Sequence, residues 1–108
     1  MKKQFRVKKN EEFDAIIKNR KFINSKAFTI YFKNKKEEYG RIGIAVPTKL
    51  GNAVFRNKTK RQIKNMLHSL NHYELKYDLI IIVRPKYLSQ SYTNNKKDLE
   101  KLMKTVKI

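Results

Sequence analysis

Apolar residues recur at intervals of three and four in three segments of the chain, and this spacing predicts three helices. The first covers residues 10–18, with Asn10 as its N-cap and two acidic residues in its first turn. The second covers about 52–70, and the third covers about 92–106, with Ser91 as its cap. Each predicted helix has one apolar face to bury.

Two further segments alternate between apolar and other residues, which is the two-residue period of a strand. Residues 26–33 and 41–46 show this alternation, and their second face carries Tyr31 among small groups such as Gly43. We interpret that face as the floor of a groove. A third strand over residues 78–84 contains LIIIV, a continuous apolar run that predicts a central strand buried on both faces.

The predicted order is helix, two strands, helix, strand, helix. It indicates an α/β fold, more closely an α+β sandwich in which helices pack a central sheet and one strand–helix–strand unit is present. A length of 108 residues suits a single domain with one modest core. Residues 1–9 are basic and are predicted to form an N-terminal arm.

The net charge and the composition limit the functions that this domain can have. The chain has 27 Lys and Arg against 9 Asp and Glu, a net charge of +18. Such an excess attracts polyanions, so nucleic acid is the first expected partner and an anionic membrane surface the second. The absence of cysteine excludes disulfides and thiolate zinc sites. No apolar stretch has the length of a transmembrane helix and no secretory signal is recognisable, so we expect a cytoplasmic protein.

The segment GNAVFRNKTKRQIK, residues 51–64, carries the densest positive charge. On a helical wheel its apolar residues share one side, and Lys60, Arg61 and Lys64 form a strip beside them. The cations lie in the first half of the helix, where the macrodipole disfavours them, and residues 51–73 contain no acid. An ordinary solvated face, which is the alternative, would mix both signs. The strip is therefore predicted to face a phosphate backbone.

The stretch GNAVFRNKTKR resembles the arginine-rich signature of the bacterial ribonuclease P protein component. The resemblance continues through KKNEEF, FTIYF, RIGIAV, DLIIIVRP and a Lys-rich final helix, and so covers nearly the whole chain. It implies a protein monomer that binds the RNA subunit of ribonuclease P and the 5′ leader of precursor tRNA. The RNA subunit removes the leader with bound Mg²⁺, so the resemblance implies no catalytic residue and no cofactor on the protein. It also implies a left-handed strand–helix–strand crossover, against the usual right-handed rule.

The resemblance assigns two sets of residues in this chain. The signature positions that face RNA correspond to Lys49, Asn52, Arg56, Asn57, Lys58, Lys60, Arg61 and Lys64. The cleft that holds the leader corresponds to Phe13, Ile17 and Tyr31. Position 58 is Lys where the family usually has Arg, which removes bidentate phosphate recognition there but keeps the charge. Position 17 is Ile where an aromatic residue is common, which removes base stacking from that side chain.

Other chemistry finds little support in the sequence. His68 and His72 lie four apart but lack a third ligand, so we predict no metal site. No paired acid and base or nucleophile motif is evident. Two aromatic residues allow two interpretations each. Phe13 is either part of the hydrophobic core or part of the leader-binding cleft, and Phe5 either stacks on RNA or packs against the fold.

Two rival functions share the sequence features. A ribosomal or other structural RNA-binding protein would have the same charge and the same α/β outline. A membrane-surface helix would need an exposed apolar face, whereas the apolar face of the basic helix is needed for the core. Dependence of precursor-tRNA cleavage on the protein separates the first rival from a ribonuclease P subunit.

Overall fold

The computed structural model describes residues 6–7, 10–35, 40–69 and 76–107 of the chain. Its elements in chain order are α1 (Asn10–Lys18), β1 (Phe22–Asn24), β2 (Phe28–Asn34), β3 (Ile42–Ala45), the 3₁₀ helix η2 (Thr48–Leu50), α2 (Ala53–His68), β4 (Tyr77–Val83), the 3₁₀ helix η4 (Pro85–Ser89) and α3 (Tyr92–Lys107). The three predicted helices and three predicted strands are confirmed. None of the helices in this part of the chain has the length and apolar character needed to cross a bilayer.

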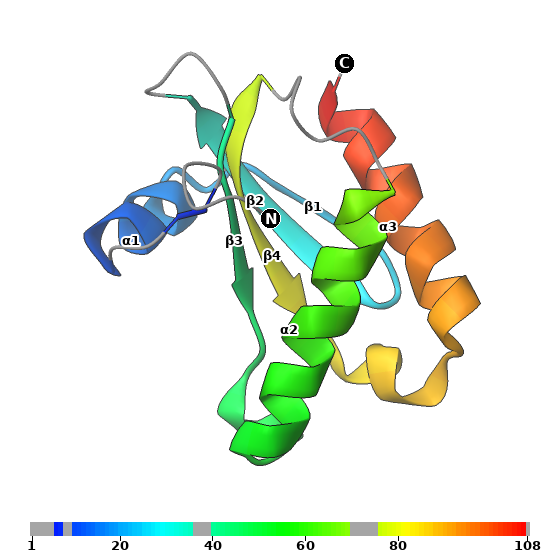
Figure 1. Cartoon of the computed structure of the whole chain (residues 1–108). Coiled ribbons are helices and arrows are strands. Elements are labelled where there is room, and N and C mark those ends of the chain that lie inside the picture. Colours follow the sequence, from blue (N-terminus) through cyan, green and yellow to red (C-terminus); the bar gives the residue numbers. More distant parts are fainter. Residues whose placement is uncertain (1–5, 8–9, 36–39, 70–75, 108) are drawn as a thin grey trace.

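Four strands form one mixed sheet in the order β1-β2-β4-β3. β2 pairs antiparallel with β1 and β4, whereas β3 and β4 are parallel and are joined through α2. Helix α1 lies on one side of the sheet, and α2 and α3 lie together on the other (Figure 1). The predicted α+β sandwich with one strand–helix–strand unit is thus confirmed, and the handedness of its crossover stays a prediction.

The central strand β4 divides its side chains between the two layers. Leu79, Ile81 and Val83 join the larger core that α2 and α3 cover. Ile80 belongs to a smaller cluster beneath α1, and Ile82 packs against that cluster. A strand with helices on both faces needs apolar residues at every position, and the unbroken run LIIIV meets this need.

The structure differs from the sequence predictions at several element ends. β1 was missed, because three residues are too few to show an alternating pattern. β2 begins at Phe28, two residues after the predicted start, since Ser25 Oγ accepts a hydrogen bond from the Phe28 amide (3.1 Å) across a bend. α2 ends at His68 with Ser69 as its C-cap, and the predicted end at residue 70 lies outside the described residues.

Two of the predicted helix starts have observable caps. The Asn52 side chain accepts a hydrogen bond from the Phe55 amide (2.9 Å), and Ser91 Oγ accepts one from the Asn94 amide (3.2 Å). Gly51 precedes the first of these caps with an extended φ of 167°. A Cβ at Gly51 would collide with the Phe55 ring. Glycine is therefore favoured at this position by the close approach of that ring.

The basic arm is not entirely separate from the fold. Val7 is buried with Ile16 and Ile80 beneath α1, and its amide donates to the Ile42 carbonyl (3.1 Å). Arg6 forms an isolated parallel bridge with Ile42. The end of the arm therefore extends the sheet beside β3.

Candidate nucleic-acid interface

A groove of about 220 Å³ lies beside β3, the last strand in the sheet order, and is lined by residues of both α1 and α2. We call it the cationic groove. Its lining residues are Arg6, Val7, Phe13, Ile42, Gly43, Ile44, Lys60 and Lys64. They come from the arm, α1, β3 and α2, so the groove exists only once these segments have packed together.

The aromatic wall of the cationic groove is Phe13. Its ring packs directly over Gly43, where an added Cβ would lie 2.7 Å from Phe13 Cζ and 2.8 Å from Ile80 Cδ1. Only glycine leaves room for the ring at this position of β3. Phe13 packs against the cluster beneath α1 and also lines the groove, so its packing role is observed and its place in a leader cleft stays a prediction.

The opposite wall of the cationic groove is formed by Lys60 and Lys64, one turn apart on α2. Both residues are partly buried, since their stems lie against the fold. Ammonium groups placed across from an aromatic ring suit a ligand with both phosphates and flat rings. The groove therefore joins two of the predicted cations with one of the predicted cleft residues.

The other predicted RNA-facing residues lie outside this groove. Asn52 uses its side-chain oxygen as the α2 cap, and Arg56 is half-buried, with Nε donating to the Asn52 carbonyl (3.4 Å). Three of the remaining residues, Lys49 on η2 with Asn57 and Arg61 on α2, are exposed. Lys58 is exposed on the far side of α2, where it borders a second cavity. The residues of the signature thus extend over two sides of α2.

Tyr31 lies on the same sheet face as Phe13 but does not line the cationic groove. The strand pairing places Tyr31 beside Ile80, and Ile80 beside Gly43, in one row across the sheet. Two strand spacings separate Tyr31 from Gly43, or about 10 Å. The predicted groove floor is therefore partly filled by the Phe13 ring and Ile80, and Tyr31 stands beyond them.

Phe22 on β1 extends this row, and the sequence reasoning missed it. The Phe22 and Tyr31 rings have centroids 5.2 Å apart at an angle of 39°. Phe22 is 49% exposed, although it is a large apolar residue. Ile17, the third predicted cleft residue, is exposed on α1, one turn beyond Phe13. An aromatic residue beside basic neighbours at Arg20 and Lys21 was the available sequence signal for Phe22.

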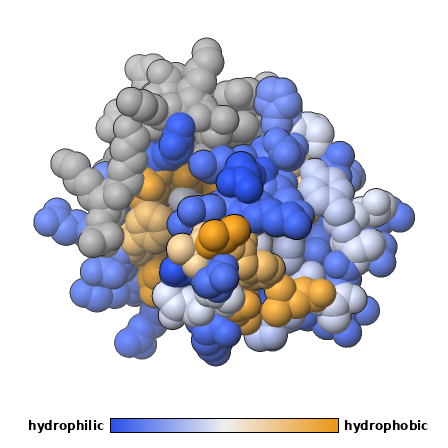
Figure 2. Space-filling view, turned by 60° about the horizontal axis from the view of Figure 1, so that its bottom comes forward, coloured by the Kyte–Doolittle hydropathy of each residue, from blue (hydrophilic) through white to orange (hydrophobic). Residues whose placement is uncertain are grey.

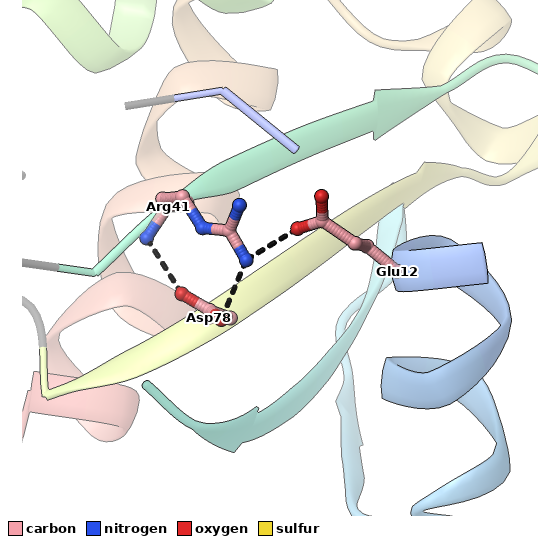
Figure 3. Close-up of polar contacts among 3 residues, drawn as sticks. All are labelled: Glu12, Arg41 and Asp78. Carbon is pink, nitrogen blue, oxygen red and sulfur yellow. Dashed lines mark hydrogen bonds and ion pairs between the residues drawn. The ribbon is translucent and has the colours of Figure 1, made fainter. Parts of the chain in front are cut away.

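A charged cluster fastens α1, the helix that carries Phe13, to the sheet (Figure 3). Arg41, just before β3, forms ion pairs with Glu12 of α1 and with Asp78 of β4. Its amide also donates to Asp78 Oδ1 (3.0 Å), and its Nη2 to Asp78 Oδ2 (3.3 Å). The sequence predicted Glu12 only as a charge favourable to the α1 dipole. Its contact with Arg41 joins residues that are remote in the chain.

Burial and pairing act in opposite directions on this guanidinium. Burial alone lowers the pKa of Arg41, but the hydrogen bonds that Arg41 donates to Glu12 and Asp78, together with the charges of these two carboxylates, outweigh it and raise that pKa above its ordinary value. Arg41 is thus a permanent cation whose charge is already satisfied within the fold. It stays directed toward its two carboxylates and is not offered to an external phosphate.

The described residues contain no group of three or more His, Cys, Asp or Glu side chains that could hold a metal ion. His68 is exposed at the end of α2, and His72 lies outside the described residues. The cationic groove is lined by cations, one aromatic ring and aliphatic residues of the arm and β3. This composition suits binding of a polyanion.

The fold and the cationic groove define a class of protein: small, basic α+β domains in which a cationic helix borders an aromatic groove. Solved structures that resemble this chain include RNase P proteins. The RNase P protein of Staphylococcus aureus superposes with a TM-score of 0.84 at 34% identity, covering 96% of this chain and 98% of that one. The RNase P protein of Thermotoga maritima gives a TM-score of 0.82 at 26% identity, covering 94% and 96% of the two chains.

The sequence model of the Ribonuclease P family matches residues 1–107 of the chain. The Ribonuclease P protein component of Mycoplasma capricolum subsp. capricolum is 44% identical over 110 residues, covering 99% of this chain and all of that one (100%). That of Mycoplasmopsis synoviae is 40% identical over 102 residues, covering 94% and 89%. The chain belongs to the ribonuclease P protein family, as its resemblance indicated. It is a subunit of ribonuclease P, an endoribonuclease of tRNA processing.

Proposed function

We propose that this subunit acts as a monomer in the cytoplasm, where it binds the ribonuclease P RNA through α2 and holds the 5′ leader of precursor tRNA along the α1 face of the sheet. The observation that carries the proposal is the cationic groove, where Lys60 and Lys64 stand across from Phe13 over Gly43. A single-stranded leader presents phosphates and unstacked bases together, and these walls suit both.

The electrostatics of α2 support contact with the RNA subunit. Its first turn contains no acid, and its cations lie on both sides of the helix. Phosphate contacts provide most of the affinity for nucleic acid without sequence preference. We place Lys49, Asn52, Arg56, Asn57, Lys58, Arg61 and the two groove lysines in this contact.

The aromatic row on the α1 face supports a path for the leader. From the cationic groove the path passes Phe13 and continues to the paired rings of Tyr31 and Phe22, while Ile80, which lies between them in the sheet, is fully buried and makes no contact with the leader. Bases of a single strand stack on such rings whatever their sequence. Ile17 borders this path as an apolar wall and not as a stacking group. The chemistry of cleavage belongs to the RNA subunit and its Mg²⁺, and the protein positions the substrate.

The test of RNA-subunit binding is the salt dependence of affinity. Lys60→Ala and Lys64→Ala should each reduce the slope of log K against log salt by roughly 0.7–0.9, the value of one lost phosphate contact. The matched control is Lys104→Ala on α3, whose side chain is 74% exposed and pairs only with Glu100 among the described residues. If the groove variants and the control gave equal slopes, the cationic groove would not be part of the RNA interface.

The leader path has its own test in the assembled holoenzyme. Tyr31→Ala should weaken the binding of precursor tRNA by roughly 5- to 150-fold, since stacking of a base on the ring contributes about 1–3 kcal/mol. Mature tRNA, which has no leader, should bind as before. The control Tyr31→Phe keeps the ring and should retain precursor affinity. Equal losses for precursor and mature tRNA would show that Tyr31 only supports the fold.

A further inference from the structure

A second cavity lies on the other side of α2 from the cationic groove. It has a volume of about 200 Å³ and is formed by the first turns of α2, by η4 and by the start of α3. We call it the α2–α3 cavity. These segments meet at the lower end of the molecule in Figure 1, the end that faces the viewer in Figure 2. Its volume is below the roughly 300–1,000 Å³ of sites for drug-sized ligands, so it suits a single ring system.

The polar wall of the α2–α3 cavity is fixed before any ligand arrives. Tyr87 is buried, and its hydroxyl donates to Gln62 Oε1 (2.8 Å). Asn95 is also buried, with Nδ2 donating to the Tyr87 carbonyl (3.1 Å) and Oδ1 accepting from Gln90 Nε2 (2.8 Å). These bonds join α2, η4 and α3, so the wall is preorganised.

The same bonds leave one donor and one acceptor without a partner among the described residues. Gln62 uses only its oxygen, so its Nε2 group remains available, and Gln90 uses only its nitrogen, so its Oε1 remains available. Both side chains line the cavity. A nucleobase presents donors and acceptors side by side along one edge and can satisfy both groups. An apolar guest would leave them unpaired, at a cost in affinity.

The remaining walls suit the faces of a flat ring and a phosphate. Leu88 and Tyr92 are 50% and 43% exposed, and both line the cavity together with Phe55. Figure 2 shows apolar side chains reaching the surface of this end of the molecule among hydrophilic ones. Lys58 is an exposed cation on the rim, and the described residues that line the cavity include no acid.

We propose that the α2–α3 cavity binds one unpaired nucleobase of an RNA, with the base against Tyr92, its edge on Gln62 and Gln90, and its phosphate at Lys58. The inference rests on the proposed function, since it takes RNA as the partner of α2. It adds a base-binding site to a helix that otherwise contacts only phosphates. Lys58 then serves this cavity and not the cationic groove.

The test is a titration of the isotopically labelled full chain with each of the four ribonucleoside 5′-monophosphates, followed by NMR. At least one nucleotide should shift the side-chain amide signals of Gln62 and Gln90 with a Kd of millimolar order. Ribose 5-phosphate carries the phosphate but no base, and should leave both signals unmoved. Tyr92→Ala should weaken binding of the nucleotide by roughly 5- to 150-fold. Tyr92→Phe keeps the ring and should retain the affinity.

Several results would overturn the proposal. One is the absence of shifts with all four nucleotides, and another is equal shifts with ribose 5-phosphate, which would reduce the site to a phosphate contact. Uptake of indole but of no nucleotide would assign the cavity to an apolar group of another protein. Since the titration of the unaltered chain decides between these outcomes, the folding of a variant is not critical. The salt slopes of Lys60→Ala and Lys64→Ala test RNA binding separately, so failure of this inference is distinguishable from failure of the function.

Discussion

Neutralising one carboxylate of the Glu12–Arg41–Asp78 cluster should loosen α1, because this cluster ties the helix to the sheet (Figure 3). The substitution is Glu12→Gln, which keeps the shape of the side chain and removes its charge. The Glu12 and Arg41 side chains are 17% and 13% exposed, so water replaces little of the lost interaction. Arg41 still retains Asp78, and the variant is therefore expected to fold.

The magnitude follows from the kinds of hydrogen bond exchanged. A hydrogen bond to one charged group contributes about 1.5–3 kcal/mol, and hydrogen bonds that involve ionised groups are roughly twice as strong as neutral ones. The glutamine oxygen can still accept from the charged Arg41, so Glu12→Gln loses only the ionic part of the contact and should cost about 1–2 kcal/mol. Arg41→Ala is more severe, since it leaves two largely buried carboxylates without their cation, and should cost about 3–5 kcal/mol.

The assay is urea unfolding at neutral pH, with Glu100→Gln as the matched control. Glu100 makes the same kind of ion pair with Lys104, but the two side chains are 39% and 74% exposed. An exposed pair one helical turn apart contributes only about 0.3–0.5 kcal/mol. With a slope of about 1.5 kcal/mol per molar urea, the midpoint should fall by about 1 M for Glu12→Gln and by no more than about 0.3 M for the control.

Hydrogen exchange locates the effect within the molecule. The amides of α1 should exchange faster in Glu12→Gln, while those of α3 change only as far as global stability changes. High salt should remove the small effect of the Glu100 pair and leave that of the Glu12 pair nearly intact, because buried pairs are poorly screened. Equal midpoint shifts in the two variants, or unchanged exchange in α1, would refute the claim that this cluster anchors the helix.

Three further predictions test packing, capping and pH dependence. Gly43→Ala should lower the free energy of unfolding, measured in urea, by about 1–3 kcal/mol, because the new methyl group must displace the Phe13 ring. A decrease below about 0.5 kcal/mol would contradict this packing. Asn52→Ala removes the α2 cap and should cost about 1 kcal/mol, measured in the same way, whereas Asn52→Ser should retain most of the stability. Burial, with a smaller contribution from nearby Tyr92, raises the pKa of Tyr87 from 10.0 to about 12. The neutral phenol therefore stabilises the fold below about pH 10, and this contribution is lost as the pH rises to about 12. Between about pH 9 and about pH 11 the unfolding midpoint should consequently fall less in Tyr87→Phe than in the unaltered chain. If the two proteins lost stability equally over this range, the raised pKa of Tyr87 would be contradicted.

The sequence predicted those parts of the fold that depend on local periodicity. The apolar stripe of the last helix is one example, since Leu99, Leu102, Met103 and Val106 are all buried as its spacing indicates. The continuous run in β4 is another, because a strand between two helical layers leaves no polar face. In both cases a one-dimensional pattern contains the information, and the surrounding fold only confirms it.

The contacts that build the site are of another kind. Arg41 pairs with Asp78 across 37 residues, and nothing in the local pattern around either residue indicates a partner. The packing of Phe13 over Gly43 likewise depends on how α1 crosses the sheet. The wheel of α2 placed Lys60 and Lys64 correctly on one strip, but only the packing of η4 and α3 shows that Lys58 faces a different cavity.

The distribution of the few acids explains how so basic a chain folds without losing its positive surface. Glu12 and Asp78 turn inward to Arg41, and Asp98 accepts hydrogen bonds from the Ala27 amide (3.1 Å) and Gln90 Nε2 (3.5 Å). Each of these acids joins separate elements of the fold, so each stabilises tertiary structure where its charge is shielded from a bound polyanion. The first turn of α2 holds no acid at all. Crowded cations on that helix repel one another in the free protein, and a phosphate backbone relieves the repulsion when it binds. The same distribution of charge therefore makes the free domain less stable than its core would allow, and under the proposed function it makes the complex with RNA correspondingly more favourable.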